Sequence, residues 1–421
     1  MGDKNSEKTR RDFLKKSVTG IAGMAVLPAV IGCSKGVKED APMEDTAAPA
    51  PATQETKAPS GTGEIITRKL GKNGPDLPIV SMGVMDAENP DLVRAALEAG
   101  IVHLDTANGY QGGRNEEMIG GVIKDFPRDS YVLATKIYED QDRRSGTFTE
   151  NATNETFMEK FETSLTRLGL DYVDILYLHS IGTREAALHE PYLELMSKLK
   201  QEGRIRMIGV STHSKEPEVI RAAIESKVYD VVLTAYNFRQ PHVAEMEKAM
   251  KEASDAGLGI VAMKTQAGVY WDRERQHPIN MKAALKWALR NDYVHTAIPG
   301  MTAFEHLELD ATVMRDLELT PAEELDLKED TQMGLFCDQC RQCVGQCRMG
   351  VEIPTVMRSY MYAYGYRNLR NAKETLETAG LTGDPCGKCR SCTVDCTMRF
   401  DVKSKIEDIA RLRDVPYDLI A

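Results

Sequence analysis

Apolar and polar residues follow two different rhythms through the middle of the chain. Eight short runs are apolar at nearly every position, at residues 77–83, 102–107, 131–137, 172–180, 205–212, 231–237, 259–266 and 294–300. Seven segments between them repeat apolar residues every three or four positions, at residues 90–100, 115–126, 155–169, 191–203, 217–227, 242–257 and 281–292. Strands that are apolar on both faces are typical of parallel sheets covered by helices. Eight strand–helix units in succession predict an α/β fold, a closed (β/α)8 barrel, over an open sheet.

The barrel is expected to occupy residues 64–320, with a short hairpin in front of it. Residues 65–78 contain the dipeptide Asn73-Gly74, which is a strong turn signal between two strands. The remaining residues, 321–421, hold eight of the nine cysteines of the chain and are expected to form a second domain.

The first 33 residues are typical of a targeting signal rather than of a folded element. Arg10 and Arg11 precede a short, weakly apolar stretch that ends at Cys33. The pair resembles a twin-arginine signal, whose transport system moves folded proteins; the alternative is a chance pair on an unstructured tail. The residues just before Cys33 resemble a lipoprotein processing site, which would make Cys33 an acylated first mature residue; the alternative is a free thiol. Residues 1–33 therefore predict export to the periplasm or cell surface, with a lipid anchor.

Residues 34–63 have almost no apolar bulk and are rich in Pro, Ala, Thr and charge. Such a composition cannot bury enough surface to offset the entropy lost on ordering, so this segment is expected to be a disordered tether. The whole chain has 64 acidic and 53 basic residues and a net charge of -11, which argues against a nucleic-acid partner. The sequence has no run of eighteen apolar residues, so the expected contact with a membrane is the anchor at Cys33.

Four polar residues lie at or just after the carboxyl ends of three consecutive predicted strands. They are Asp105, Tyr110, Lys136 and His179. In a (β/α)8 barrel these ends meet at one mouth, where the active site lies. A lysine that is itself paired with an aspartate favours the phenolate of a nearby tyrosine and eases proton donation, and a histidine can orient a carbonyl oxygen. The alternative for each residue alone is a structural ion pair or a rim histidine.

These residues lie in motifs that resemble the aldo-keto reductases. The motifs are DTANGY, LATKIY, YLHS and GRIRMIGVST, and the resemblance covers about residues 64–317. It implies Tyr110 as the general acid, Lys136 and Asp105 as the pair that tunes it, and His179 as the residue that orients the substrate. It also implies a nicotinamide cofactor, NAD(P).

The residues that would contact this nicotinamide depart from the family pattern. Ser211 matches, but Thr212 stands where the family has Asn and Leu233 where it has Gln. Met263, followed by Lys264, replaces a stacking aromatic residue. Near Thr302, where a predicted helix start could face a pyrophosphate, the segment offers Ala303 and His306 but no Lys or Arg. A 2′-phosphate would gain little there, which favours NAD over NADP and leaves open that no free nicotinamide binds.

The second domain repeats the pattern C-x2-C-x2-C-x3-C. The eight cysteines are Cys337, Cys340, Cys343 and Cys347 in the first run, and Cys386, Cys389, Cys392 and Cys396 in the second. Zinc sites usually draw on two separated pairs, whereas this spacing is that of bacterial ferredoxins. Two runs therefore predict two 4Fe-4S clusters; a disulfide framework and two structural zinc ions are the alternatives.

The resemblance to two-cluster ferredoxins implies a crossed set of ligands, in which the fourth cysteine of each run binds the other cluster. On this pattern Cys396 joins the first three cysteines of the first run, and Cys347 joins the first three of the second. Arg348 and Thr397 replace the proline that usually follows each run, and the insert at residues 353–380 is long and is expected to be helical.

The combination predicts an exported oxidoreductase that interconverts a carbonyl and an alcohol and exchanges electrons through two clusters. Its partners would be a small carbonyl or alcohol substrate and a redox protein. The alternative is an iron–sulfur electron-transfer protein that uses the barrel as a docking scaffold, without nicotinamide chemistry.

Overall fold

The computed structural model of the chain describes residues 63–142, 144–268, 278–327, 336–337, 339–381, 383–387, 389–397 and 400–420. The predicted export signal at residues 1–33, including Cys33, and all of the predicted tether except its last residue lie outside these ranges. None of the helices among the described residues is both long enough and apolar enough to span a membrane.

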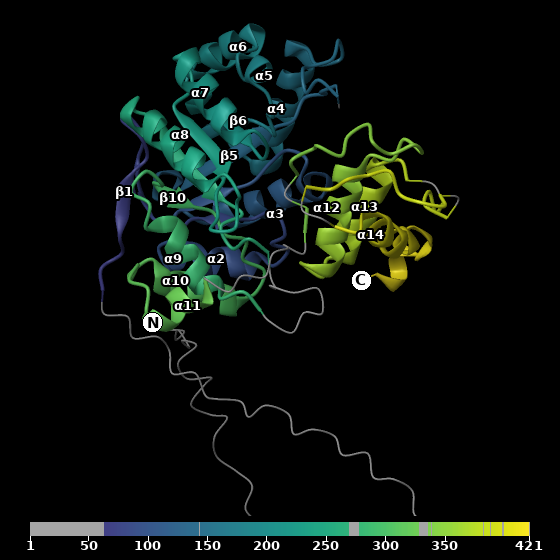
Figure 1. Cartoon of the computed structure of the whole chain (residues 1–421). Helices are drawn as coiled ribbons and strands as arrows, with labels where there is room; N and C mark the ends of the chain where they lie inside the picture. Colours follow the sequence, from purple (N-terminus) through teal and green to yellow (C-terminus); the bar gives the residue numbers. More distant parts are fainter. Residues whose placement is uncertain are drawn as a thin grey trace, which may run out of the picture. The chain divides into compact units, whose positions relative to one another are not determined.

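Eight parallel strands form one sheet in sequence order, as the apolar runs predict. They are β3 (Met82–Gly83), β4 (His103–Asp105), β5 (Val132–Ile137), β6 (Val173–Leu178), β7 (Ile205–Thr212), β8 (Val231–Ala235), β9 (Gly259–Met263) and β10 (Thr296–Ala297) (Figure 1). Parallel bridges from Val80 to Ala297 and from Gly83 to Gly300 bring the first and last strands together. The predicted (β/α)8 barrel is confirmed.

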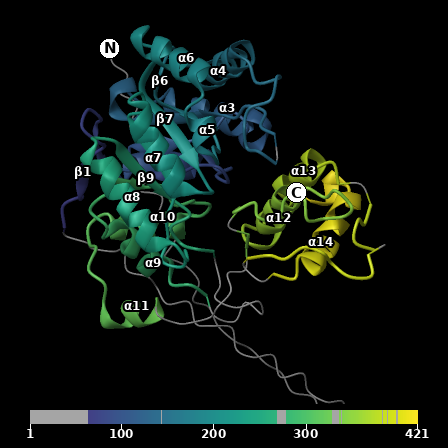
Figure 2. The same ribbon diagram turned by 45° about the horizontal axis from the view of Figure 1, so that its top comes forward.

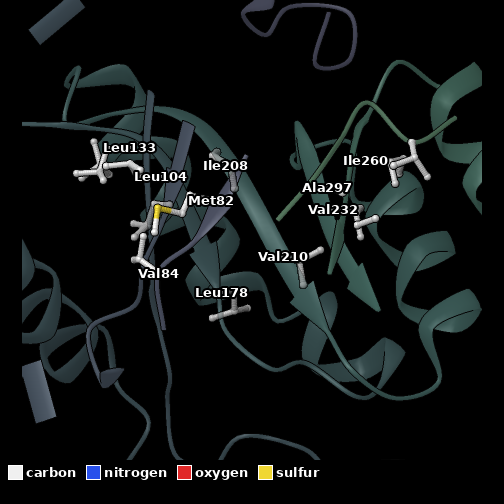
Figure 3. Close-up of a cluster of buried hydrophobic side chains, with 14 of the residues drawn as sticks. Met82, Val84, Leu104, Leu133, Leu178, Ile208, Val210, Val232, Ile260 and Ala297 are labelled. Atoms are coloured by element: carbon white, nitrogen blue, oxygen red, sulfur yellow. The ribbon is translucent and has the colours of Figure 1, made fainter. Parts of the chain in front are cut away.

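Helices cover the outside of the strands (Figure 1, Figure 2). Those that the helical rhythm predicts are α2 (Pro90–Glu98), α3 (Arg114–Ile123), α4 (Asn154–Leu168), α6 (Glu190–Gln201), α7 (Glu216–Ser226), α8 (Val243–Asp255) and α9 (Met281–Leu289). Local signals fix their ends: for α4, the side chain of Thr153 accepts a hydrogen bond from the Thr156 amide and Gly169, at φ 66°, ends the helix. Figure 3 shows the buried layer beneath such helices, where Leu104, Leu133 and others are fully buried.

Three further helices are α5 (Arg184–Ala187), α10 (Phe304–Val313) and α11 (Pro321–Asp326). The sequence predicts the start of α10, near Thr302, but neither α5 nor α11. α5 and α11 are too short to show a helical period, and α10 has apolar residues around much of its circumference. α11 contacts α9, and Asn280 Nδ2 donates to Asp326 Oδ2 at 2.8 Å.

The predicted hairpin is also present, as β1 (Thr67–Lys69) paired antiparallel with β2 (Asp76–Pro78). Leu70 and Leu77 belong to the core inside the barrel, together with Tyr177 and Leu233. A Cβ on Gly71 would lie 2.5 Å from the backbone nitrogen of Gly259, at the start of β9. The hairpin therefore packs against the amino ends of the strands, and the carboxyl ends remain for chemistry.

The C-terminal part is helical and has a core of its own. It contains α12 (Ile353–Tyr364), α13 (Leu369–Thr378), α14 (Val402–Ala410) and the 3-10 turns η3 (Arg411–Asp414) and η4 (Tyr417–Leu419). Residues of all three helices are buried together with Cys343 and Cys386. The helical insert between the cysteine runs is therefore confirmed. The barrel and this part belong to one compact unit, while the domain boundary at residue 320 stays a prediction.

Candidate active site and cluster site

Lys136, on β5, lies at the centre of a buried hydrogen-bonded group at the carboxyl end of the barrel. Its Nζ donates to Asp105 Oδ1 at 2.5 Å, to the Thr106 carbonyl oxygen at 2.7 Å and to the Tyr110 hydroxyl at 3.2 Å. Lys136 and Asp105 are 2 % and 1 % exposed, so water screens their charges little. The register of β4 and β5 pairs Asp105 with Ala134, which puts Asp105 and Lys136 on the same inner face.

The loop that carries Tyr110 is held from both sides. Tyr110 begins the 3-10 turn η1 (Tyr110–Gly113), in which Gln111 adopts a left-handed φ of 52°. Just before it, Thr106 donates to Asn115 Oδ1 at 2.7 Å, and Asn115 Nδ2 donates to the Val84 carbonyl at 2.7 Å. These buried contacts fix the phenol beside Lys136 without any bound group.

A second set of polar contacts supports the same loop from α3 and α4. Glu116 accepts from Thr135 at 2.7 Å and from Arg167 at 3.2 Å, and Arg167 also donates to the Asn108 carbonyl at 2.9 Å. The sequence reasoning does not include these residues, nor Asn115, because no motif distinguishes them from surface polar residues of the same helices.

The charges of the site favour protonated Lys136 and limit the rise in the Tyr110 pKa. Burial opposes the charge of Lys136, but Asp105 and Tyr110 together raise its pKa above 10.5. Burial raises the pKa of Tyr110 above 10, Lys136 lowers it and Asp105 adds to the rise. Lys136 therefore lowers the pKa of Tyr110, as expected, but burial of the phenol raises this pKa by more.

His179, just after β6 (Val173–Leu178), lies beside Tyr110, with their ring centroids 6.1 Å apart and the rings edge to face. Tyr138 and His213 lie on its other sides, each with its ring centroid 6.4 Å from that of His179. Burial, followed by Lys136 and Arg358, lowers the pKa of His179 well below 6.5. A neutral imidazole next to the phenol can orient a carbonyl oxygen. The structure thus brings all four residues of the predicted tetrad together.

The residues expected around the nicotinamide offer few unengaged polar groups. Ser211 Oγ accepts from the Ser180 amide at 2.9 Å, and Thr212 donates to the Ser214 carbonyl at 3.0 Å. Leu233 is fully buried in the barrel core, and Met263, at the end of β9, is 8 % exposed. These residues fit a nicotinamide carboxamide only in part, because neither Thr212 nor Leu233 presents a spare donor to it.

The remaining nucleotide residues lie at the ends of β9 and β10. Lys264 has a left-handed φ of 55°, and its carbonyl accepts from Asn237 Nδ2 at 3.2 Å. Thr302 lies two residues before the first residue of α10, rather than at the helix start. The amide of Thr302 donates to His306 Nδ1 at 3.3 Å, so this amide, which was expected to face a pyrophosphate, already has a partner.

The two cysteine runs form two groups. Cys337, Cys340, Cys343 and Cys396 line one enclosed cavity. Its other walls include the apolar side chains of Ile353, Met357, Phe400 and Val402. Cys340 Sγ also lies 3.3 Å from the Thr397 hydroxyl. This cavity combines three cysteines of the first run with the fourth of the second.

The second group is closer to solvent. Cys386 is buried and Cys392 exposed. Burial raises the pKa of the Cys386 thiol to about 11, and after Asp384 and Glu407 the next causes are the nearby thiols of Cys347 and Cys389. Cys347, the fourth cysteine of the first run, therefore lies near the second run.

The donor set fits iron–sulfur clusters. All eight cysteines of the runs are free thiols, which argues against the disulfide alternative. In the part of the chain that the structure describes, no three Cys, His, Asp or Glu side chains lie close enough together to bind one metal ion. A four-iron cluster would bind each thiolate through a different iron, so its cysteine sulfurs are expected to lie farther apart than those around a single ion.

Comparison with known proteins finds a family match in both parts. Residues 77–283 match the aldo/keto reductase family, and residues 336–401 match the 4Fe-4S dicluster domain. The barrel is therefore similar to the aldo/keto reductases. The C-terminal part, called the dicluster domain below, is similar to 4Fe-4S dicluster domains, which supports the prediction of iron–sulfur clusters.

Individual relatives match the reductase domain. The chain is 37% identical over 163 residues to an uncharacterized oxidoreductase, YqkF, of Bacillus subtilis, over 38% of this chain and 52% of that protein. It is 31% identical over 199 residues to the NADH-specific methylglyoxal reductase of Escherichia coli, over 43% of this chain and 59% of that protein. The chain thus spans about half the length of the curated relatives that it matches. A solved aldo-keto reductase of Bacillus halodurans, in its holo form, has the same fold, with a TM-score of 0.52, 23% identity and coverage of 66% of this chain and 100% of that one.

Proposed function

We propose that the protein is an oxidoreductase of aldo-keto reductase type that interconverts a carbonyl and an alcohol, coupled to two 4Fe-4S clusters. One observation carries this proposal: Lys136 Nζ joins Asp105, the Thr106 carbonyl and the Tyr110 hydroxyl in one buried group beside His179. A structural ion pair alone would not require a phenol as the third partner.

Each residue has a chemical role in this proposal. Reduction of a carbonyl to an alcohol takes up two electrons and two protons. Tyr110 donates one proton to the carbonyl oxygen, and Lys136 stabilises the phenolate that remains, while Asp105 keeps Lys136 charged. Neutral His179 orients the carbonyl oxygen toward Tyr110. In the reverse direction the same phenolate accepts the proton of the alcohol.

The electrons have two candidate carriers. A bound nicotinamide nucleotide supplies both electrons and a proton as hydride; NAD is preferred to NADP because Thr302 and its neighbours carry no Lys or Arg. Two 4Fe-4S clusters exchange one electron each, so together they match the two electrons of the reaction, and the proton that goes to carbon then comes from water. Ser211, Thr212, Met263 and Lys264 would line the nicotinamide site, with the incomplete fit described above.

The grouping of the cysteines supports crossed ligation. Cys337, Cys340, Cys343 and Cys396 would hold one cluster, and Cys347, Cys386, Cys389 and Cys392 the other. The first group shares an enclosed, largely apolar cavity. The second group has an exposed cysteine, which favours it as the point of electron exchange with a redox protein.

The place of action is proposed from the N-terminal sequence. The twin-arginine-like signal and Cys33 favour export and lipid anchoring at the periplasm or cell surface. Export in the folded state would allow the clusters and any nucleotide to be loaded beforehand.

An electron-transfer protein with a barrel as docking scaffold is the second candidate. The observation that favours it is the poor nicotinamide site, in which Leu233 is fully buried and the Thr212 hydroxyl already donates to the Ser214 carbonyl. On this reading the tetrad is a remnant, and neither nucleotide binds.

Replacement of the Tyr110 hydroxyl tests the proposed reaction. Tyr110→Phe should lower reduction of benzaldehyde and phenylglyoxylate by roughly 100-fold or more, with NADH, NADPH or reduced methyl viologen as donor. The control is Tyr192→Phe on α6, because the Tyr192 hydroxyl has no hydrogen-bond partner among the described residues and the ring belongs to the hydrophobic core beneath the helices. Equal turnover in Tyr110→Phe and wild type would exclude Tyr110 as the acid.

A further inference from the structure

The dicluster domain contacts the loop of the barrel mouth that follows β3. The Tyr362 hydroxyl, on α12, donates to Met85 Sδ at 3.5 Å. From α13 and the residue before it, Asn371 Nδ2 donates to Asp86 Oδ1 at 3.2 Å and Asn368 Nδ2 donates to Glu88 Oε1 at 3.1 Å. The helices therefore lie at the end of the barrel where the tetrad is.

Two other loops of the same mouth contact the dicluster domain. Arg114, which follows the turn that begins at Tyr110, donates to Glu374 Oε1 at 3.0 Å. After β9, a Cβ on Gly268 would lie 3.7 Å from Cδ2 of Phe336, next to the first cluster cysteine. Contacts on the loops after β3, β4 and β9 mean that the dicluster domain forms part of the rim around the active site.

Arg358 is on the part of α12 that this arrangement brings to the rim. It lies one turn before Tyr362, on the same helix face, because residues four apart in a helix are neighbours. The preceding residue, Met357, lines the cluster cavity instead. Arg358 Nη2 donates to Gln339 Oε1 at 3.0 Å, and Gln339 Nε2 donates to the Pro354 carbonyl at 3.1 Å. Gln339 thereby holds one edge of the guanidinium, which has five N–H donors in all.

The charge of Arg358 acts on the active site itself. After burial and Lys136, Arg358 is the next cause that lowers the pKa of His179. For His213 the causes after burial are Lys264, His179, Arg358 and Lys136. No carboxylate is among the causes for either histidine. Arg358 and Lys136 therefore lie close enough to both histidines to influence their pKa values.

The carboxylates near this region each have other partners. Asp105 is paired with Lys136 at 2.5 Å, and Asp86 accepts from Asn371 at 3.2 Å. Asp140 and Glu352, which raise the pKa of Tyr138 beside His179, accept from Thr149 and from the Thr355 amide. His213 Nδ1 is buried and has no hydrogen-bond partner among the described residues. The region next to His179 thus combines the guanidinium of Arg358 with an unpaired imidazole nitrogen, an arrangement that favours an anionic ligand.

We propose that Arg358 of the dicluster domain binds the carboxylate of a substrate whose carbonyl lies at Tyr110 and His179, so that the substrate is a keto acid or the corresponding hydroxy acid. The proposal rests on the function proposed above. A guanidinium binds a carboxylate through two parallel N–H donors, which fixes the orientation of the substrate as well as its charge. The domain that holds the clusters would then also select the substrate of the barrel.

Equilibrium binding to the full, cluster-loaded chain tests this without requiring turnover. The ligands are phenylglyoxylate and its neutral amide, phenylglyoxylamide, which have nearly the same shape, titrated anaerobically by calorimetry. Wild type should bind the anion at least 10-fold more tightly than the amide. Arg358→Gln should lose this preference, through a 10- to 100-fold weaker binding of the anion, while binding of the amide stays unchanged. Arg358→Lys should recover part of it.

Matched controls separate recognition from folding and from catalysis. Arg370→Gln removes the same charge from an exposed position of α13 and should keep the preference. Unchanged amide binding and iron content show that Arg358→Gln is folded. Tyr110→Phe should keep the preference for the anion even if all turnover is lost. A wild-type protein that prefers the anion but does not reduce it would disprove the proposed function and leave the proposed recognition by Arg358 standing. Equal affinity of wild type for both ligands, or an unchanged preference in Arg358→Gln, overturns the proposal.

Discussion

The barrel and the dicluster domain position their functional groups in different ways. In the barrel, Asp105 and Lys136 project from strands whose buried apolar neighbours fix the backbone. In the dicluster domain, each of the eight cysteines lies outside the strands and α-helices that the structure describes. Packing therefore builds the first site in advance, whereas the binding of iron contributes to folding at the second. Loss of one group should consequently have local effects in the barrel and cooperative effects around the clusters.

Cysteine substitutions should produce the largest change, the loss of a cluster, and should affect the dicluster domain alone. Cys396→Ser and Cys340→Ser should each remove the same cluster, leaving about four of about eight irons, because both residues line one cavity. Cys347→Ser and Cys389→Ser should each remove the other cluster. Iron content and electron paramagnetic resonance of the reduced proteins distinguish the two clusters. If Cys396→Ser instead matches Cys389→Ser, ligation is uncrossed.

A buried carboxyl in the barrel gives the next largest effect, on stability. Both carboxyl oxygens of Asp310, on α10, are buried without a hydrogen-bond partner among the described residues, and burial raises the Asp310 pKa from 3.8 to about 8. The folded state therefore holds a proton that the unfolded chain releases, and the stability of the barrel falls as pH rises from about 4 to about 8. Asp310→Asn should raise the free energy of unfolding by at most about 4 kcal/mol at pH 7, and by much less at pH 4.

Denaturant titrations at pH 4 and pH 7 measure this difference. Exposed Glu308→Gln, on the same helix, is the control and should change stability little at either pH. A gain in Asp310→Asn that is the same at both pH values would show that the carboxyl is not protonated in the folded protein.

Close packing inside the barrel gives the smallest of these effects. A Cβ on Gly209 would lie 2.3 Å from Cδ1 of Tyr177, whose ring is fully buried. Gly209→Ala should destabilise the barrel by about 1–3 kcal/mol, through displacement of this ring. Gly121, on α3, has no atom within 4 Å of its Cβ position, so Gly121→Ala should be neutral or stabilising. Thermal unfolding compares the two, and equal stability would contradict the close packing at Gly209.

The same contrast explains how much of the molecule can be predicted from sequence. The strands of the barrel follow from continuous apolar runs, and the tetrad follows because the carboxyl ends of consecutive parallel strands meet at one mouth of a barrel. Only the start of α10 was predicted, since its apolar residues lack a single face, and α11, which has only six residues, was not predicted. The cysteine spacing predicts clusters, while the cavity around Cys396 required the fold to bring the two runs together.

Contacts between distant segments could not be predicted. Arg358 is one basic residue in a helix rich in tyrosine and methionine, and no motif relates it to His179. Asn371 and Asp86 are 285 positions apart, so their hydrogen bond depends on how α13 lies against the β3 loop. Thr212 and Leu233 show the reverse case: their departure from the family pattern was visible in the sequence, and the structure adds that Thr212 is already engaged.

Electron transfer between the clusters and a carbonyl tests the central proposal most directly. The cluster-loaded protein is reduced, freed of excess reductant and mixed anaerobically with phenylglyoxylate, with and without one equivalent of NAD+. The account predicts that the paramagnetic signal of the reduced clusters disappears in at least one of these mixtures. It also predicts one mandelate for every two clusters oxidised and no reaction in Tyr110→Phe. Clusters that stay reduced in the wild-type protein under both conditions would contradict it.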